Sequence, residues 1–361
     1  MPRRDFRVVR DRFARDEGLP FGRLLNREYV LSVLESEGHP YRSRVFCPLV
    51  TLWAWLSQAL SQDKSLNEAV SRILANRVAT GLPPCSASSA GYTKARQRFP
   101  GEVMRRMARE IGRKVHNSAD SAWNWRGRQV FLVDGTGLTM ADTKENQLAY
   151  PQSAASPKGL GFPIVRSAAL ISLATGAVMD MAFARYKGKG TGELSMLRSL
   201  VDNLSAGNIL VADRLYPTYS TVAMLQRRGI DLVSVSHQAR NVDFSAGHVL
   251  GPKDHIVEWT KPQGREYLDS QEHSELPATV RVREFAIEIE GRDGKPEQAI
   301  IVTTITDPTV PQKELSDLYW RRWNCELDIR SIKHSMHIST VPSYRRCLTR
   351  KGGKWLRRFQ W

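Results

Sequence analysis

The sequence predicts an α/β protein in which helices layer a sheet, with a helical region before the sheet and one β-rich insertion within it. Three observations predict this class. Residues 1–118 have helical patterns, short apolar runs alternate with amphipathic helices from residue 128 onward, and a long helix closes the region at residues 312–336. The chain has 361 residues, of which 41% are hydrophobic, so it is long enough for one large domain and smaller additional ones.

The first region is expected to be entirely helical. Its apolar spacing and breaks place helices at residues 48–60, 65–77, 88–98 and 101–115. Residues 65–68 read Ser-Leu-Asn-Glu, a capping box that predicts the start of the second of these helices. The Gly-Leu-Pro-Pro segment at residues 81–84 separates it from the third.

The second region has the strand and helix order of a layered sheet. Buried-type strands are expected at residues 129–133, 164–173, 177–185, 208–212, 232–236 and 299–305. Helices are expected at residues 193–204 and 217–228. Residues 237–298 break the alternation with strand-like pieces and turns, and we interpret them as a β-rich insertion.

Two aspartates directly follow expected buried strands: Asp134 in VFLVDGTG and Asp213 in ILVADRLY. Functional groups of α/β folds lie at such strand ends. Two apposed carboxylates repel each other unless a cation neutralises them or one is protonated. Mg²⁺ prefers oxygen ligands of this kind. Alternatively, each aspartate simply caps a turn, as in Asp134-Gly135.

The closing helix carries an unusual polar stripe. Tyr319, Arg322, Glu326 and Lys333 fall within roughly 60° of one another on a helical projection. A buried stripe would not combine these residue types. The alternative is an ordinary solvated face, on which Arg322 and Glu326 form an i,i+4 ion pair.

The formal net charge of +16 points to a polyanionic partner, with nucleic acid ahead of an anionic membrane surface. The chain has no apolar run of 18 residues, no secretory signal and no lipidation signal. Its four cysteines are scattered without C-x-x-C spacing, so neither a zinc site nor a disulfide framework is predicted. A reducing cytosol is the expected compartment.

These motifs resemble those of the DDE transposases of bacterial insertion sequences. The closer resemblance is to insertion sequence family four, which is marked by the signature Y-(2)-R-(3)-E-(6)-K. Tyr319, Arg322, Glu326 and Lys333 match every spacing, and VDGT and ADRLY resemble the family's two aspartate motifs. The resemblance covers roughly residues 40–336. It implies a ribonuclease-H-like mixed sheet flanked by helices.

The resemblance also implies a chemistry. Asp134, Asp213 and Glu326 would form the catalytic, metal-binding triad, holding two Mg²⁺ ions, with Mn²⁺ as a substitute, for an in-line phosphoryl displacement. Tyr319, Arg322 and Lys333 match positions that hold a phosphate near the transposon end. The implied partners are double-stranded DNA, both transposon ends and target, and a second copy of the chain in the DNA complex. The implied location is the bacterial cytoplasm, at the nucleoid and not at a membrane.

Two further groups are candidate DNA contacts. Trp259, in the insertion, could stack on an unpaired base at the DNA end; the alternative is that it packs inside the inserted sheet. Tyr92, Lys94, Arg96 and Arg98 form a helix face whose residue types reach phosphates and base edges, or they are a solvated basic helix.

The expected organisation has five parts. They are a helical DNA-binding region (1–118), the first part of the catalytic core (119–236), the β-rich insertion (237–298), the rest of the core with the signature helix (299–336) and a basic tail (337–361). The tail holds seven Lys or Arg and no Asp or Glu, which departs from the family pattern. The leading hypothesis is therefore an active transposase. The alternatives are a truncated, inactive remnant that binds DNA ends, and a host nuclease with a ribonuclease-H-like core.

Overall fold

A computed structural model describes residues 25–61, 63–152, 161–186, 188, 190–237, 240–290, 296–322 and 340–341. The chain divides into two compact units. The first contains the helices up to Ile111, and the second runs from Gly112 to Pro342. Each unit is described separately below.

The first unit is helical, as the sequence predicts. Its helices are α2 (Arg27–Ser36), α3 (Pro48–Leu60), α4 (Leu66–Ala79), α5 (Ala90–Arg98) and the first part of α6 (Gly101–Asn117). Ser65 is the N-cap of α4, and its hydroxyl accepts from the Glu68 N–H at 3.1 Å. Apolar side chains from all of these helices form one core.

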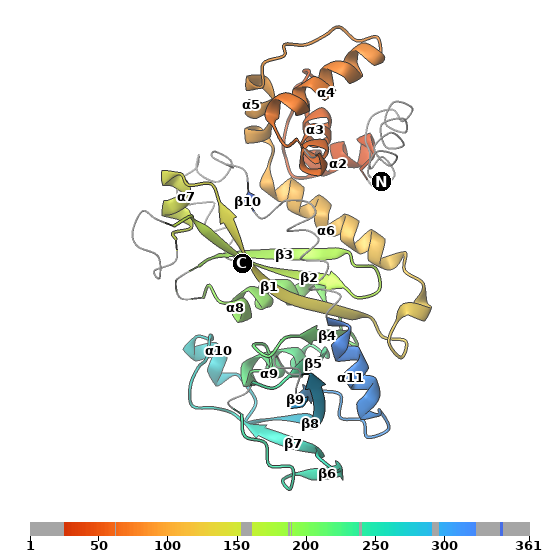
Figure 1. Ribbon diagram of the computed structural model, residues 1–361, viewed down its shortest axis with the longest axis vertical. Helices are drawn as coiled ribbons and strands as arrows, with labels where there is room; N and C mark the ends of the chain where they lie inside the picture. Colours follow the sequence, from red (N-terminus) through yellow and green to blue (C-terminus); the bar gives the residue numbers. More distant parts are fainter. Residues whose placement is uncertain are drawn as a thin grey trace. The chain divides into compact units, whose positions relative to one another are not determined.

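The second unit is built on a mixed sheet (Figure 1). Its strands are β1 (Val130–Met140), β2 (Ile164–Ser172), β3 (Val178–Arg185), β4 (Ile209–Ala212), β5 (Asp231–Val235), β6 (His248–Gly251), β7 (Asp254–Thr260), β8 (Thr279–Glu290) and β9 (Pro296–Thr303). They lie in the order β3-β2-β1-β4-β5-β9-β8-β7-β6. β1 is parallel to β4 and β4 to β5, while the other pairs on this path are antiparallel. The short strand β10 (Thr340–Val341) pairs with the far end of β1.

Helices cover both faces of this sheet. The described helices of this unit after α6 are α7 (Lys144–Ala149), α8 (Glu193–Leu200), α9 (Tyr219–Arg227), α10 (Ser270–Ser274) and α11 (Gln312–Trp320), with 3-10 turns η1 (Ser121–Trp123) and η2 (Val201–Asn203). Phe131 and Val133 of β1 pack on α8 and α9 on one face. Val130 and Leu132 pack with α11 on the other. Alternate residues of β1 thus face opposite sides, as in any strand buried on both faces.

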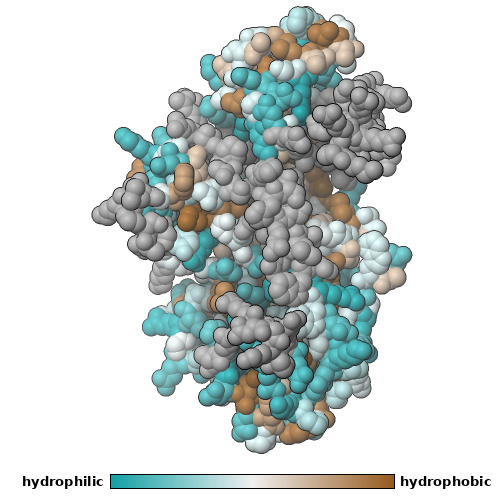
Figure 2. Space-filling view, in the orientation of Figure 1, coloured by the Kyte–Doolittle hydropathy of each residue, from teal (hydrophilic) through white to brown (hydrophobic). Residues whose placement is uncertain are grey.

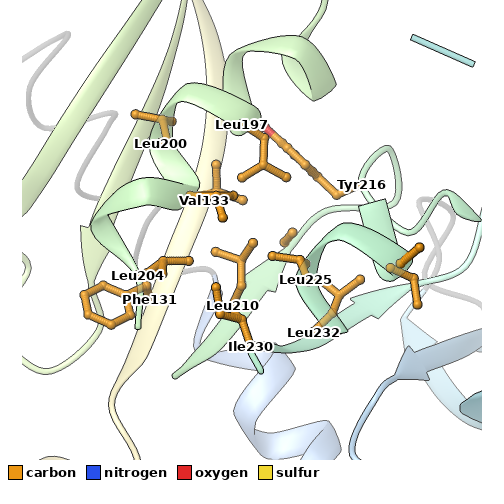
Figure 3. Close-up of a cluster of buried hydrophobic side chains, with 14 of the residues drawn as sticks. Phe131, Val133, Leu197, Leu200, Leu204, Leu210, Tyr216, Leu225, Ile230 and Leu232 are labelled. Atoms are coloured by element: carbon orange, nitrogen blue, oxygen red, sulfur yellow. The ribbon is translucent and has the colours of Figure 1, made fainter. Parts of the chain in front are cut away.

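The core between β1, β4 and the helices α8 and α9 is shown in Figure 3. Leu197 and Leu200 of α8 and Leu225 of α9 meet Val133 and Leu210 of the two strands. These five side chains are essentially inaccessible to solvent. Burying an aliphatic side chain stabilises the fold by about 1.5–3 kcal/mol, so this cluster fixes β1 against β4.

The predicted fold class is confirmed: a mixed α/β sheet with flanking helices and a helical N-terminal region, of the ribonuclease-H-like kind. One predicted detail is wrong. β1 does not end before Asp134 but continues to Met140, because β2 pairs with it along this length, Asp134 with Ala169 among them. The inserted strands β6–β8 are continuous with this sheet, since β8 pairs with β9 and β9 with β5.

The described surface has isolated exposed apolar side chains, such as Leu148 and Val249. On the face in Figure 2, hydrophobic and hydrophilic areas alternate. Single exposed apolar residues are normal for a folded protein and need no functional explanation. Among the described residues, no helix has the length and apolar character needed to cross a bilayer.

Candidate active site

The two aspartates predicted from the sequence come together at the paired strands β1 and β4. The parallel register joins Leu132 to Val211 as its last pair. Asp134 and Asp213 each lie two residues beyond that pair. Neighbouring strands are about 4.8 Å apart, so the register brings the two residues side by side where β1 and β4 separate.

Both aspartates belong to the face of the sheet that α11 covers. Leu132 and Val211 pack with Leu315 and Leu318 of α11. Because side chains alternate along a strand, the residue two positions after each of these strand residues continues on the same face. The described start of the predicted signature helix, α11, therefore covers this face of the sheet.

Local hydrogen bonds hold each carboxylate in place. The Gly135 N–H donates to Asp134 Oδ1 at 3.0 Å, and the Leu215 N–H donates to Asp213 Oδ1 at 2.8 Å. The Ser234 hydroxyl of β5 donates to the backbone oxygen of Asp213 at 2.7 Å. Both aspartates are half-buried. They are thus fixed by neighbouring backbone while remaining open to solvent on one side.

Arg322 links the signature helix to this pair. It is half-buried, and its guanidinium carbon lies 5.8 Å from the ring centroid of the buried Tyr319. Burial by itself lowers the pKa of Arg322, but Tyr319, Asp134 and Asp213 outweigh it and hold that pKa above its ordinary value. The negative charges of both aspartates thus contribute to the raised pKa of Arg322.

Two functional candidates escaped the sequence analysis: Glu193, at the start of α8, and Tyr216, in the turn after Asp213. Burial raises the pKa of Glu193, and so do the negative charges of Asp213 and Asp134. Burial, followed by the charges of Glu193, Asp213 and Asp134, raises the pKa of Tyr216 well above its usual range. An acidic residue in the first turn of a helix is ordinary, so sequence spacing gave no signal for Glu193.

The donor set suits a hard cation. The negative charges of Asp134 and Asp213 both affect the pKa values of Arg322 and Glu193. Their carboxylate oxygens are ligands of the kind that Mg²⁺ prefers. Glu326 and Lys333, the other two predicted residues of the signature helix, lie outside the described residues. Within the described part of the chain, no three His, Cys, Asp or Glu side chains are grouped to hold a metal ion. A complete triad would therefore need Glu326.

Trp259 is packed inside the sheet, which is the alternative that the sequence left open. Its side chain is only 5% exposed, and its indole N–H donates to the buried Glu284 carboxylate at 3.1 Å. The guanidinium carbon of Arg240 lies 3.7 Å from the ring centroid. The ring is covered in this conformation, so the interpretation of Trp259 as a base-stacking residue is corrected to a packing role.

The predicted DNA-facing surface of α5 is smaller than expected. Tyr92 is fully buried, and its hydroxyl donates to Gln58 Oε1 at 2.9 Å. Arg96 is half-buried, with its guanidinium carbon 4.8 Å from the Trp55 ring centroid. Tyr92 and Arg96 therefore hold α5 against α3, which corrects their interpretation as surface contacts. Lys94 and Arg98 are exposed and remain candidates for DNA contact.

Variants of α5 separate packing from binding. Tyr92→Phe removes the hydrogen bond to Gln58 and should lower the free energy of unfolding by about 1 kcal/mol. Lys94→Ala should leave that free energy within about 0.5 kcal/mol of wild type but weaken DNA binding. Urea unfolding and a gel shift measure the two effects. Equal stability of Tyr92→Phe and wild type would contradict the packing role.

An acidic pair at adjacent parallel strands of a ribonuclease-H-like sheet, with Arg322 following the helix α11 on the same face, is typical of phosphoryl-transfer proteins. Comparison with known proteins agrees. Residues 125–347 match the transposase DDE domain family, and the chain belongs to that family. It is similar to the transposase InsG for insertion sequence element IS4 of Escherichia coli (strain K12), with 24% identity over 323 residues, covering 89% of this chain and 69% of that protein. The resemblance to insertion sequence family four is thereby confirmed.

Proposed function

We propose that this chain cleaves DNA at the ends of an insertion sequence and joins them to target DNA, using divalent metal ions held by Asp134, Asp213 and Glu326. One observation supports it most. The β1–β4 register brings Asp134 beside Asp213, and the negative charges of both aspartates help to raise the pKa of Arg322 in the signature helix. Members of this family are polynucleotidyl transferases that bind DNA and generally use divalent metal. When bound, two metal ions would stabilise the attacking and leaving oxygens of an in-line displacement.

The remaining roles belong to side chains of the chain itself. Arg322, with Tyr319 and Lys333, would hold a phosphate of the transposon end, because a guanidinium, a phenol and an ammonium are all phosphate partners. Gly135 and Leu215 orient the two aspartates through their backbone N–H groups. Lys94 and Arg98 of α5 would contact the DNA backbone outside the catalytic core, and the family resemblance supports two copies of the chain on the paired ends.

A strand-transfer assay tests the proposal. The substrate is linear DNA ending in the inverted repeats that flank the gene, mixed with a supercoiled target and Mg²⁺. Cleavage at the repeat end and joining to the target are expected only when Mg²⁺ and the repeats are both present. Cleavage without preference for the repeats would identify a nuclease instead. Binding to the repeats without cleavage in Mg²⁺ or Mn²⁺ would identify an inactive end-binding protein.

The signature-helix cations give a separate prediction. Arg322→Ala and Lys333→Ala should each weaken binding to the cleaved end, because each removes a phosphate contact. Each should also reduce the slope of log affinity against log salt concentration by about 1. Fluorescence anisotropy over a salt series measures both quantities. Wild-type affinity and slope in both variants would show that this helix does not hold the phosphate.

A further inference from the structure

Glu193 lies between the two segments that carry the catalytic aspartates. It is the first residue of α8, directly after the N-cap Gly192, and its side chain is half-buried. Burial raises its pKa, and the negative charges of Asp213 and Asp134 raise it further. A half-buried acid beside two acidic side chains is unfavourable for folding, which calls for a functional explanation.

The first contact of Glu193 is with the backbone that follows Asp134. A side chain built on Gly135 would overlap the Glu193 carboxyl group, because that group lies against the Gly135 Cα. The Gly135 N–H is also the donor to Asp134 Oδ1. Glu193 therefore packs against the backbone unit that orients Asp134, and a Cβ at position 135 would require the Glu193 side chain to shift.

The second contact is with the turn that follows Asp213. The hydroxyl of Tyr216 donates to Glu193 Oε2 at 3.3 Å, and its ring is fully buried. The Tyr216 N–H donates to the backbone oxygen of Asp213 at 3.2 Å and closes the turn. One carboxyl group thus touches both the VDGT and the ADRLY segments.

These contacts come from behind the aspartates. Phe131 and Val133 pack on the α8 face, so alternation assigns Gly135 to that face and Asp134 to the opposite one, under α11. Glu193 can therefore set the separation of the two strand segments without occupying the space in front of the aspartates.

We propose that Glu193 is a positioning residue that joins the Gly135 backbone to Tyr216 and so sets the separation of Asp134 and Asp213 for metal binding. This inference rests on the proposed metal-dependent function. Glu193 acts through the shape of its side chain and through hydrogen bonding. Glutamine keeps the length of the side chain and an oxygen that accepts from Tyr216, whereas alanine keeps neither.

The test compares Glu193→Gln, Glu193→Ala and Tyr216→Phe in the full-length chain. Glu258→Ala is the matched control, because Glu258 is an exposed glutamate of β7 in the same unit. Mn²⁺ binding is measured by calorimetry without DNA, and cleavage of a transposon end is measured over a Mn²⁺ series. Residues that orient metal ligands typically change metal affinity by about 10–100-fold.

Glu193→Ala should weaken Mn²⁺ binding by about 10-fold or more and raise the Mn²⁺ concentration needed for half-maximal cleavage equally. Glu193→Gln should keep both values near those of wild type. Tyr216→Phe should give values between those of wild type and Glu193→Ala. The control should match wild type. Tyr216→Phe keeps its buried ring, so its Mn²⁺ affinity tests the inference if Glu193→Ala does not fold.

Two results would overturn the inference. One is wild-type Mn²⁺ affinity in both Glu193→Ala and Tyr216→Phe. The other is equal loss in Glu193→Gln and Glu193→Ala at equal melting temperature, since the negative charge and not the shape would then matter. Asp134→Asn separates this from failure of the proposed function. If Asp134→Asn also binds Mn²⁺ normally, the metal site itself is wrong; if it loses Mn²⁺ while Glu193→Ala does not, only the role of Glu193 is wrong.

Discussion

Replacing Asp213 with asparagine is expected to abolish DNA cleavage, with a fall in rate of at least about 10³-fold. The substitution keeps the size of the side chain and an oxygen that accepts from the Leu215 N–H. It removes the charge that would hold a metal ion beside Asp134. Metal ions contribute several kcal/mol to the stabilisation of such transition states, and each 1.36 kcal/mol is about tenfold in rate. Cleavage of an end-labelled transposon end in Mg²⁺ measures the loss.

A matched control comes from the same unit of the chain. Asp202 is an exposed aspartate paired with Arg228 at 2.6 Å, so Asp202→Asn changes the same chemical group without touching the site. It should cleave at the wild-type rate, because surface ion pairs contribute little. DNA binding of Asp213→Asn should survive. Cleavage by Asp213→Asn within tenfold of wild type would remove Asp213 from the proposed triad.

The second large effect is expected at a buried ion pair in the inserted strands. Arg283 and Asp254 form two hydrogen bonds, at 2.9 and 2.6 Å, and are almost inaccessible to solvent. Arg283 also donates to the backbone oxygens of Asp307 and Val310, which lead into α11. Arg283→Ala leaves the Asp254 charge buried without this partner. It should therefore lower the free energy of unfolding by about 3–5 kcal/mol.

Guanidinium unfolding of the full-length chain measures this loss. Arg281→Ala is the control, since Arg281 is exposed on the same strand β8 and should change stability by less than about 0.5 kcal/mol. The double variant Asp254→Leu, Arg283→Met removes both charges and should recover much of the stability. An Arg283→Ala variant as stable as Arg281→Ala would contradict the role of this pair in holding the start of α11.

The sequence predicted the fold well because its signals are local. Apolar runs such as residues 208–212 gave the buried strands, and the Ser65 cap marked the start of α4. The length of β1 could not be predicted, because residues 135–137 are Gly-Thr-Gly, which interrupts the apolar pattern, and they become strand by pairing with β2. The continuity of the inserted strands with the sheet depends on β9 pairing with β5, a contact between distant segments.

The residues of the candidate site also divide into those with a local sequence signal and those whose contacts come only from the tertiary fold. Asp134 and Asp213 were predicted because each follows an apolar strand signal, and the register then brings them together. Glu193 was missed because its contacts to Gly135 and Tyr216 are tertiary. Trp259 and Tyr92 are buried, and residue type alone does not distinguish an aromatic ring that stacks on DNA from one that packs inside the fold.

The proposed activity depends on Asp134, Asp213 and Glu326 binding the catalytic metal ions together. The most direct measurement is a crystal structure of the chain with a cleaved transposon end and Mn²⁺, using anomalous scattering to locate the metal. We expect Mn²⁺ between the carboxylates of Asp134 and Asp213, about 2.1 Å from their oxygens, with Glu326 as the third ligand. We also expect a phosphate of the DNA end beside Arg322. Mn²⁺ bound elsewhere, or a Glu326 carboxylate more than about 10 Å from the two aspartates, would contradict the proposed metal site, because a metal pair spans only about 4 Å.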